Sequence, residues 1–149
     1  MTPPAAPGAA PRSRTVATWL ALVGGSLGLH RLYLYGGRDV WAWLHPWPTL
    51  VGAYGFWRMR EFGVDDARGS LLVPLLGVML AVTMLQAIVY GLTSDERWAA
   101  RHGDASAAVE RGVLTYAAVI VALAVGTSVA VATIAFTAQR YFESRAGIS

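Results

Sequence analysis

The chain has 149 residues, of which 55 % are apolar and only 14 % carry a formal charge. Soluble domains carry about 25 % charged residues, and a domain near this size leaves about 30 % of its chain surface in water, so an ordinary soluble enzyme is disfavoured. The net charge is +3, and the 12 basic residues are all Arg. These arginines form no stripe with interleaved aromatic residues, so we expect no nucleic-acid partner. The absence of Cys excludes disulfides and thiolate metal sites.

The N-terminal third of the chain combines a proline-rich tail with a first apolar run. Residues 1–14 contain four of the seven prolines and are predicted to form a disordered tail. The run from Thr15 to Tyr35 has about the 20 residues that a membrane-spanning helix needs, with His30 and Arg31 near its far end. A secretory signal peptide is the alternative reading, although no small-residue cleavage site follows.

Three further uncharged runs follow, at 40–57, 69–94 and 112–139. The run at 40–57 contains two prolines and is the least regular. The runs at 69–94 and 112–139 are strong candidates for helices at about 70–92 and 113–138. The sequence therefore predicts an all-α polytopic membrane protein with four transmembrane helices. We expect an N-terminal hairpin over 15–62, and a second pair of helices over 63–149 joined by an extracytoplasmic loop at 93–112.

Arginines in short loops predict the orientation of such a protein, because cytoplasmic loops carry an excess of them. Four spans place both termini on one side, with seven arginines there and five on the other side. Both termini are therefore predicted to be cytoplasmic. The absence of Lys and Asn and the abundance of Ala are typical of GC-rich coding, so we expect a bacterial inner-membrane protein.

Small residues at intervals of four predict close helix packing, because they let helix backbones approach each other in lipid. Gly24 and Gly28 have this spacing in the first run. A longer stripe with the same spacing occurs in the fourth run and comprises Ala118, Ala122, Gly126 and Ala130. We expect each stripe to face a helix, either of this chain or of a second copy.

The stretch GGSLGLHRLYLYGGRD, from Gly24 to Asp39, leads into a second helix rich in Trp. This glycine-rich helix end, followed by His-Arg, Tyr and a tight turn, resembles the two-transmembrane ("TM-two") domain family over about residues 14–62. Leu32 stands where the family usually has Phe, and Tyr35 precedes the expected Gly36. The resemblance implies a membrane hairpin and supplies no reaction.

The candidate contact residues cluster around this turn and comprise His30, Arg31, Tyr33 and Arg38. As an interfacial anchor, Arg31 extends its guanidinium to the headgroups while its stem stays in lipid. Asp39 can pair with Arg31 or Arg38. The alternative is a binding role for His30 and Arg31 toward an anionic lipid headgroup or a partner helix.

The sequence favours a non-enzymatic role, because no nucleophile, base and orienting group share a helix face. His30 and His45 flank the same turn, but no third ligand is spaced to complete a metal set, so no metal or cofactor is expected. We predict a structural or interaction protein whose partners are membrane lipid and another membrane protein or a second copy of the chain. The alternative is a subunit of an oligomeric transporter or channel.

Overall fold

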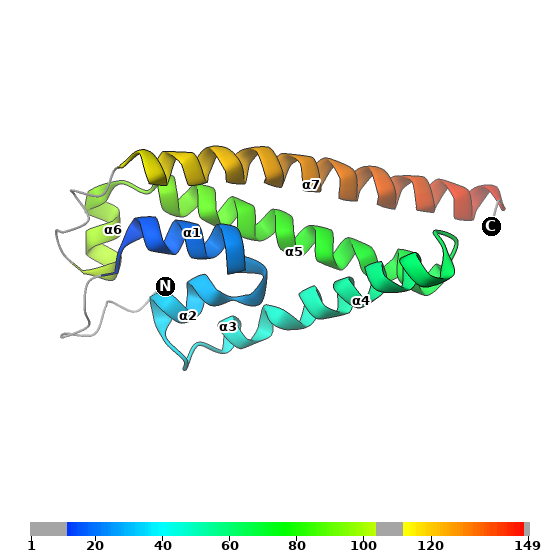
Figure 1. The fold of residues 1–149 in the computed structure, drawn as a ribbon, viewed down its shortest axis with the longest axis horizontal. Coiled ribbons are helices and arrows are strands. Elements are labelled where there is room, and N and C mark those ends of the chain that lie inside the picture. The colour runs from blue at the N-terminus through cyan, green and yellow to red at the C-terminus, as the bar shows by residue number, and fades with distance from the viewer. Residues whose placement is uncertain (1–11, 104–111, 148–149) are drawn as a thin grey trace.

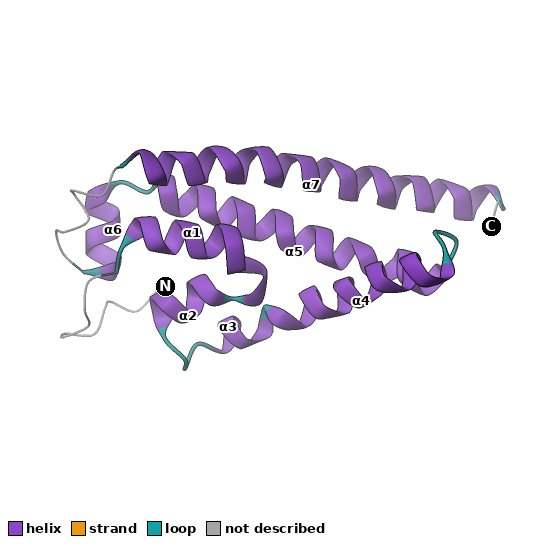
Figure 2. Cartoon of the chain, in the orientation of Figure 1, coloured by secondary structure: helices purple, strands orange, loops and turns teal. Residues whose placement is uncertain are grey.

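The computed structural model describes residues 12–103 and 112–147, and within these ranges it contains helices and no strand. The predicted all-α class is therefore confirmed. Short loops and turns join the helices in the described part of the chain (Figure 2). The elements in chain order are α1 (Arg14–Gly24), the 3-10 turn η1 (Gly25–Leu27), α2 (Leu29–Tyr35), α3 (Val40–Leu44), α4 (Pro46–Phe62), α5 (Ala67–Leu92), α6 (Asp95–His102) and α7 (Val113–Ala146).

Helix α5 is the centre of an elongated bundle (Figure 1). It packs against α4 along its N-terminal half and against α7 from Gly77 to Gly91, and α1 also contacts both α5 and α7. The short α6 crosses the end of the bundle at which α1 begins and α5 ends (Figure 1). The long helices thus form a layer that alternates in direction, with the α1–η1–α2 segment packed against one half of it.

Two helices are long and apolar enough to cross a membrane, α5 with 26 residues and α7 with 34. At 1.5 Å per residue they are about 39 and 51 Å long, compared with a hydrocarbon core of about 30 Å. They coincide with the third and fourth apolar runs of the sequence. Four spans are not supported, because the first two runs differ from the prediction.

The first run is not one continuous helix. Helix α1 ends at Gly24, and Gly28 adopts a left-handed conformation with φ +80° before α2 begins. The chain reverses there, so that α2 runs back beside α1 toward the end from which α1 started (Figure 1). At 11 residues, α1 is only about 16 Å long, which is half of the hydrocarbon thickness. We call the α1–η1–α2 segment the re-entrant hairpin.

The second run is divided between α3 and α4, because Pro46 begins a new helix directly after His45. Helix α4 has 17 residues and packs along α5. Its contact with α5 is close: a Cβ at Gly52 would collide with the Leu76 backbone, and one at Gly55 would lie 2.6 Å from Leu72 Cβ. These two glycines therefore set the distance between the helices.

The two chain ends of the described structure lie at opposite ends of the bundle (Figure 1). At one end the Arg12 amide donates to the His102 carbonyl over 3.3 Å. At the other end Arg140, near the end of α7, is 3.7 Å from Asp65 in the α4–α5 loop. The prediction that both termini share one side depended on four spans, which are not supported, so it stays a prediction. The described arginines divide six to five between the two ends, so they no longer favour one orientation.

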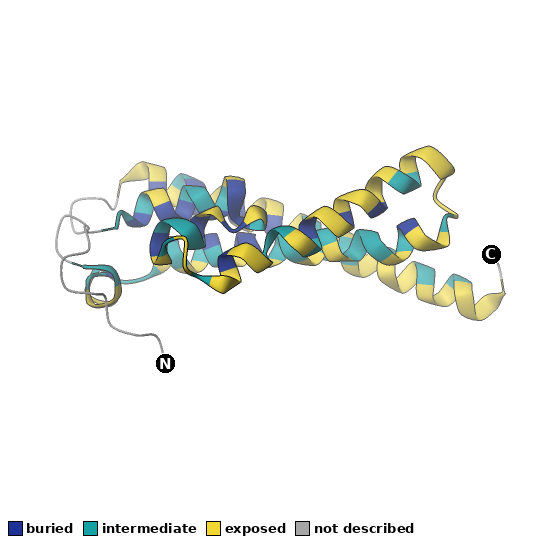
Figure 3. Cartoon of the chain, turned by 90° about the horizontal axis from the view of Figure 1, so that it is seen from below, coloured by how far each residue is buried: buried dark blue, intermediate teal, exposed yellow. Residues whose placement is uncertain are grey.

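Burial follows the helix contacts rather than the polarity of the residues (Figure 3). Buried positions cluster where α1, α5 and α7 meet, and include Ala21, Ala87 and Ala122. Large apolar side chains such as Leu71, Ile120 and Ile134 point outward instead. The bundle therefore has a narrow core of small residues and an apolar outer surface.

Candidate functional site

The tip of the re-entrant hairpin depends on glycine. A Cβ at Gly28 would collide with the Ala42 carbonyl oxygen of α3, and its φ of +80° disfavours any L side chain. The Thr49 hydroxyl of α4 donates to the Ser26 carbonyl over 2.6 Å. This bond satisfies a carbonyl within the 3-10 turn, which matters wherever no water can reach the backbone. The tip is thereby held against α3 and α4.

A polar cluster lies directly behind this tip, and we call it the His30 cluster: His30, His45, Gln86 and Tyr90. The His30 side chain of α2 is fully buried. Its ring centroid is 5.6 Å from that of His45 and 5.8 Å from that of Tyr90. The Gln86 side chain of α5 also faces His30. Three separate elements of the fold therefore bring polar groups to one place.

Hydrogen bonding within the His30 cluster is incomplete. Neither ring nitrogen of His30 is in hydrogen-bond geometry with another described residue, and the same is true of Gln86 Oε1, which is also buried. His45 Nδ1 is 2.7 Å from the Trp41 carbonyl oxygen, which can only accept, so Nδ1 carries the proton. In the neutral ring of His45, Nε2 is consequently an acceptor. Buried polar groups without partners cost free energy, which makes the cluster a candidate binding site.

Arg31 and Asp39 close the turn between α2 and α3. Arg31 Nε donates to Asp39 Oδ2 over 2.7 Å, and Asp39 Oδ1 accepts from the Trp41 amide over 3.2 Å at the start of α3. Burial of Asp39 opposes its ionisation, but the hydrogen bond and charge of Arg31 outweigh this effect and lower the pKa of the carboxyl group. The Arg31 guanidinium also lies over the Tyr35 ring, 5.1 Å from its centroid. The charge of Arg31 is thus compensated within the chain.

The remaining predicted contact residues are placed differently from one another. The Tyr33 hydroxyl accepts from the Ser13 amide over 2.9 Å, and the Arg12 guanidinium is 5.3 Å from the Tyr33 ring centroid. Tyr33 therefore holds the start of α1. Arg38 is exposed at the turn. Of the four predicted contact residues, His30 is inaccessible from outside, whereas Arg38 is available to a lipid or a partner.

The packing residues predicted from small-residue spacing lie at two kinds of position. Gly24 and Gly28 flank the break in the hairpin rather than one continuous helix face. Ala118, Ala122 and Gly126 are buried on one face of α7, and Ala130 is partly buried. A Cβ at Gly126 would lie 2.7 Å from Met84 Cβ, so this face meets α5 of the same chain.

A cavity of about 400 Å³ opens beside the His30 cluster, and we call it the hairpin pocket. It is lined by Arg31, Trp41, Leu44, His45, Pro48, Met79, Val82 and Gln86. Its walls come from α2, α3, α4 and α5. The two cluster residues that line it, His45 and Gln86, separate the pocket from the buried ring of His30.

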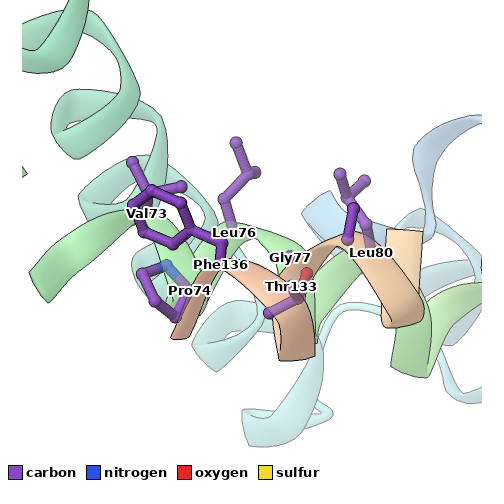
Figure 4. Close-up of a pocket in the computed structure, with 8 residues that line it drawn as sticks. Val73, Pro74, Leu76, Gly77, Leu80, Thr133 and Phe136 are labelled. Carbon is purple, nitrogen blue, oxygen red and sulfur yellow. The ribbon is translucent and has the colours of Figure 1, made fainter. Parts of the chain in front are cut away.

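A second cavity, of about 260 Å³, lies between α5 and α7 near the opposite end of the bundle and has a different character (Figure 4). Val73, Pro74 and Phe136 are among its apolar walls. The one hydroxyl group in its lining belongs to Thr133, which donates to the Val129 carbonyl within its own helix over 2.7 Å. This cavity is an apolar groove without groups that would orient a polar ligand.

Helix α6 holds the start of the re-entrant hairpin in place. The fully buried Arg14 donates through Nη1 to the Thr93 carbonyl over 2.6 Å and to Asp95 Oδ1 over 2.8 Å. The Trp98 indole donates to the Arg12 carbonyl over 2.7 Å, and its ring centroid is 4.5 Å from that of His102. Burial, together with the charge of the neighbouring Arg101, lowers the pKa of His102. These contacts are structural and lie outside the pocket.

Among residues 12–103 and 112–147, no three His, Asp or Glu side chains are grouped so that they could hold a metal ion. The sequence did not identify Gln86 and Tyr90 as partners of His30. A signal was present, because Thr83, Gln86 and Tyr90 follow the three-to-four-residue spacing of one helix face in an otherwise apolar run. Predicting their contact with His30 also required knowing that the first run folds back.

Comparisons of the sequence with protein-family models and with characterised proteins, and of the structure with solved structures, gave no match. The resemblance to the two-transmembrane domain family therefore stays a prediction.

Proposed function

We propose that this chain is a small integral membrane protein with a non-enzymatic, structural or interaction role in the bacterial inner membrane. The observation that carries the proposal is the exposure of its most apolar helices. Within the most apolar stretch of α5 only 17 % is buried by the rest of the chain, and within that of α7 only 11 %. The core helix of a soluble protein would be largely buried, so lipid is the solvent that suits these surfaces.

Helix α4 extends the apolar surface beyond the two longest helices. Its outward residues include Leu50, Val51 and Phe56. Together with α3 it covers residues 40–62, about 34 Å at the helical rise, and it runs antiparallel to α5. We therefore include α4 as a third crossing beside α5 and α7, with the re-entrant hairpin entering the bilayer from the α6 end. Three crossings place the first and last described residues on opposite sides.

The residues available to a partner lie at the α2–α3 turn. Arg38 is exposed there, and Trp41 and Trp43 beside it are each about 60 % exposed. Arg and aromatic side chains are enriched in protein contacts and at the membrane interface. We assign the interaction role to this turn rather than to the small-residue stripe, because α5 already covers the buried part of the stripe.

Membrane extraction tests the membrane assignment. Membranes containing the full chain are washed with alkaline carbonate and then with detergent. The chain is expected to stay in the pellet until detergent is added, because its apolar surface has no other cover. Release by carbonate alone would contradict the proposal.

Co-purification in mild detergent tests the interaction role. The wild-type chain is compared with Arg38→Glu at the exposed turn and with Arg60→Glu, a matched exposed arginine at the other end of the bundle. Loss of a recovered partner with Arg38→Glu alone supports the turn as the contact. Identical partners for all three chains count against it, and protein-dependent solute flux in proteoliposomes would favour the alternative of a transporter or channel subunit.

A further inference from the structure

We propose that the hairpin pocket binds the uncharged, carbonyl-bearing head of a membrane lipid, such as a quinone or a diacylglycerol. This inference rests on the proposed membrane location. It adds a ligand class and a site to that proposal.

The shape of the hairpin pocket fits the head of a lipid. Its volume of about 400 Å³ lies in the range of about 300–1,000 Å³ that is typical of small-molecule sites. Leu44, Pro48, Met79 and Val82 supply apolar walls, and Trp41 supplies a flat ring against which a planar head can lie. Leu44 and Trp41 of α3 are 49 % and 62 % exposed, so the pocket adjoins the apolar outer surface of α3. An apolar tail can therefore leave the pocket along α3 without entering water.

Two uncharged polar side chains of the pocket, His45 and Gln86, can form hydrogen bonds with an occupant. His45 and Gln86 both line the pocket, and His45 donates through Nδ1 to the Trp41 carbonyl, which leaves Nε2 as the second ring nitrogen. The amide of Gln86 adds donors. A ligand with both a carbonyl and a hydroxyl group matches this set: the carbonyl accepts from the Gln86 amide nitrogen, and the hydroxyl donates to His45 Nε2 when that nitrogen is unprotonated. Quinone and quinol together, or a diacylglycerol alone, provide these groups.

The charges that line the hairpin pocket indicate whether the bound lipid head is neutral or anionic. Arg31 is the one formally charged residue among those lining the pocket. Its guanidinium is already paired with Asp39 at 2.7 Å, and that carboxylate would repel an approaching anion. A phosphate head usually recruits uncompensated cations or a bidentate arginine. The pocket therefore favours an uncharged lipid over an anionic phospholipid.

Fluorescence quenching of the full-length protein in detergent tests the site. The probe is a decyl-substituted benzoquinone, which quenches tryptophan at close range. Saturable quenching is expected for the wild type, and Trp41→Phe should remove most of it. Trp57→Phe is the matched control, since Trp57 is similarly exposed near the far end of α4. Equal saturable quenching in the wild type and both variants would overturn the proposal.

A second pair of variants tests the hydrogen bond. Gln86→Leu keeps the volume of the side chain and should weaken quinone binding about tenfold, because one hydrogen bond to a buried group is worth about 1.4 kcal/mol. Gln139→Leu, on the exposed part of α7, should leave the affinity unchanged. Unchanged affinity in Gln86→Leu would contradict the proposed role of the amide.

Competition identifies the source of the head. Dioctanoylglycerol and dioctanoyl-phosphatidylglycerol are each titrated against the bound quinone probe. Displacement by the neutral lipid at lower concentration supports a diacylglycerol, and failure of both lipids to displace the probe supports a quinone. Stronger displacement by the anionic lipid overturns the neutral-head assignment. If the chain needs detergent for extraction but does not bind the probe, only the proposed site is overturned. If carbonate alone releases the chain, the proposed membrane location is overturned as well.

Discussion

Gly28 shows how much a single residue without a side chain decides in this fold. Its left-handed backbone and its contact with the Ala42 carbonyl occur at the same position. No other standard residue meets both requirements without strain. The reversal of the first apolar run therefore depends on Gly28. The interval of four residues between Gly24 and Gly28, from which helix packing was predicted, also places a glycine at this turn.

Gly28→Ala is expected to destabilise the protein by at least about 1–2 kcal/mol, the cost of a left-handed alanine, with the collision at α3 adding to it. The measurement is thermal unfolding in detergent. Gly37→Ala is the matched control, because open space surrounds Gly37 and its φ is ordinary. Equal melting temperatures for the two variants would show that the tip is not packed as described.

Asp66 provides a pH-dependent prediction at the opposite end of the bundle. Arg58 donates to both carboxylate oxygens of Asp66, over 2.9 and 2.8 Å, and the Gly69 amide donates to Oδ2 over 2.6 Å. The hydrogen bond from Arg58 is the largest influence and lowers the pKa of Asp66 from 3.8 to about 2. Because the folded-state pKa is depressed, this stabilisation is fully present above the unfolded value and is lost as the pH falls through about 2.

The measurement for Asp66 is a carboxyl-carbon NMR titration in detergent. In Arg58→Gln the pKa of Asp66 should rise toward its ordinary value of 3.8. Arg60→Gln, two residues along the same helix and exposed, should leave it in place. A wild-type pKa near 3.8 would contradict the bidentate pair.

At the scale of whole elements, hydrophobic run length predicted both ends of α5 to within three residues and the start of α7, but not the end of α7. The predicted helices at about 70–92 and 113–138 compare with Ala67–Leu92 and Val113–Ala146 in the structure. Run length works there because a long uncharged segment has one favourable conformation in lipid, a continuous helix. The C-terminal end of α7, after the uncharged run, contains charged residues and was therefore not predicted from run length.

The length of the apolar run did not predict the helices of the first two segments, because a glycine or a proline interrupts the helical backbone within each segment. Gly28 and Pro46 divide runs that hydropathy alone treats as continuous. The reversal also depends on a contact with α3 and on the Thr49 hydroxyl, which are distant in sequence. The candidate site shares this limit: His30, Arg31 and Arg38 were identifiable from the turn, whereas Gln86 could be joined to them only once the fold was known.

The contact between α4 and α5 gives a prediction at this scale. Gly52→Val should force the two helices apart and cost about 1–3 kcal/mol, because the new side chain meets the backbone of α5 rather than a flexible chain end. Ala53→Val places the same side chain on the exposed side of α4 and should change the stability little. Unfolding in detergent measures both variants, and equal stabilities would contradict the close packing.

Helix α6 gives a second prediction at the element scale. Trp98 is buried to 1 % exposure, and its replacement by Ala removes both its packing and its bond to Arg12. We expect a loss of about 3 kcal/mol or more and faster hydrogen exchange of amides 95–102. Trp98→Phe keeps most of the packing and should retain most of the protection. Unchanged exchange in Trp98→Ala would show that α6 is not docked through this residue.

At the scale of the whole molecule, the proposed topology of three crossings and one re-entrant hairpin predicts the accessibility of engineered cysteines. The chain has no native Cys, so single replacements can be labelled cleanly. Ser13 and Gly37 should react from the same side of the membrane, and Val64 and Gly147 from the other side. The measurement is labelling of intact cells with an impermeant maleimide before and after permeabilisation. Labelling of Ser13 and Gly37 from opposite sides would restore a two-span hairpin and contradict the reversal at Gly28.

The tie between the start of α1 and later parts of the chain has a consequence for biosynthesis. Arg14 meets Asp95 across 81 positions, Trp98 meets Arg12 across 86, and the hydroxyl groups of Thr15 and Thr115 approach to 2.6 Å across 100. The ribosome therefore releases the earliest apolar segment long before its anchors exist. That segment can therefore take its final position only after α5, α6 and the beginning of α7 have been synthesised.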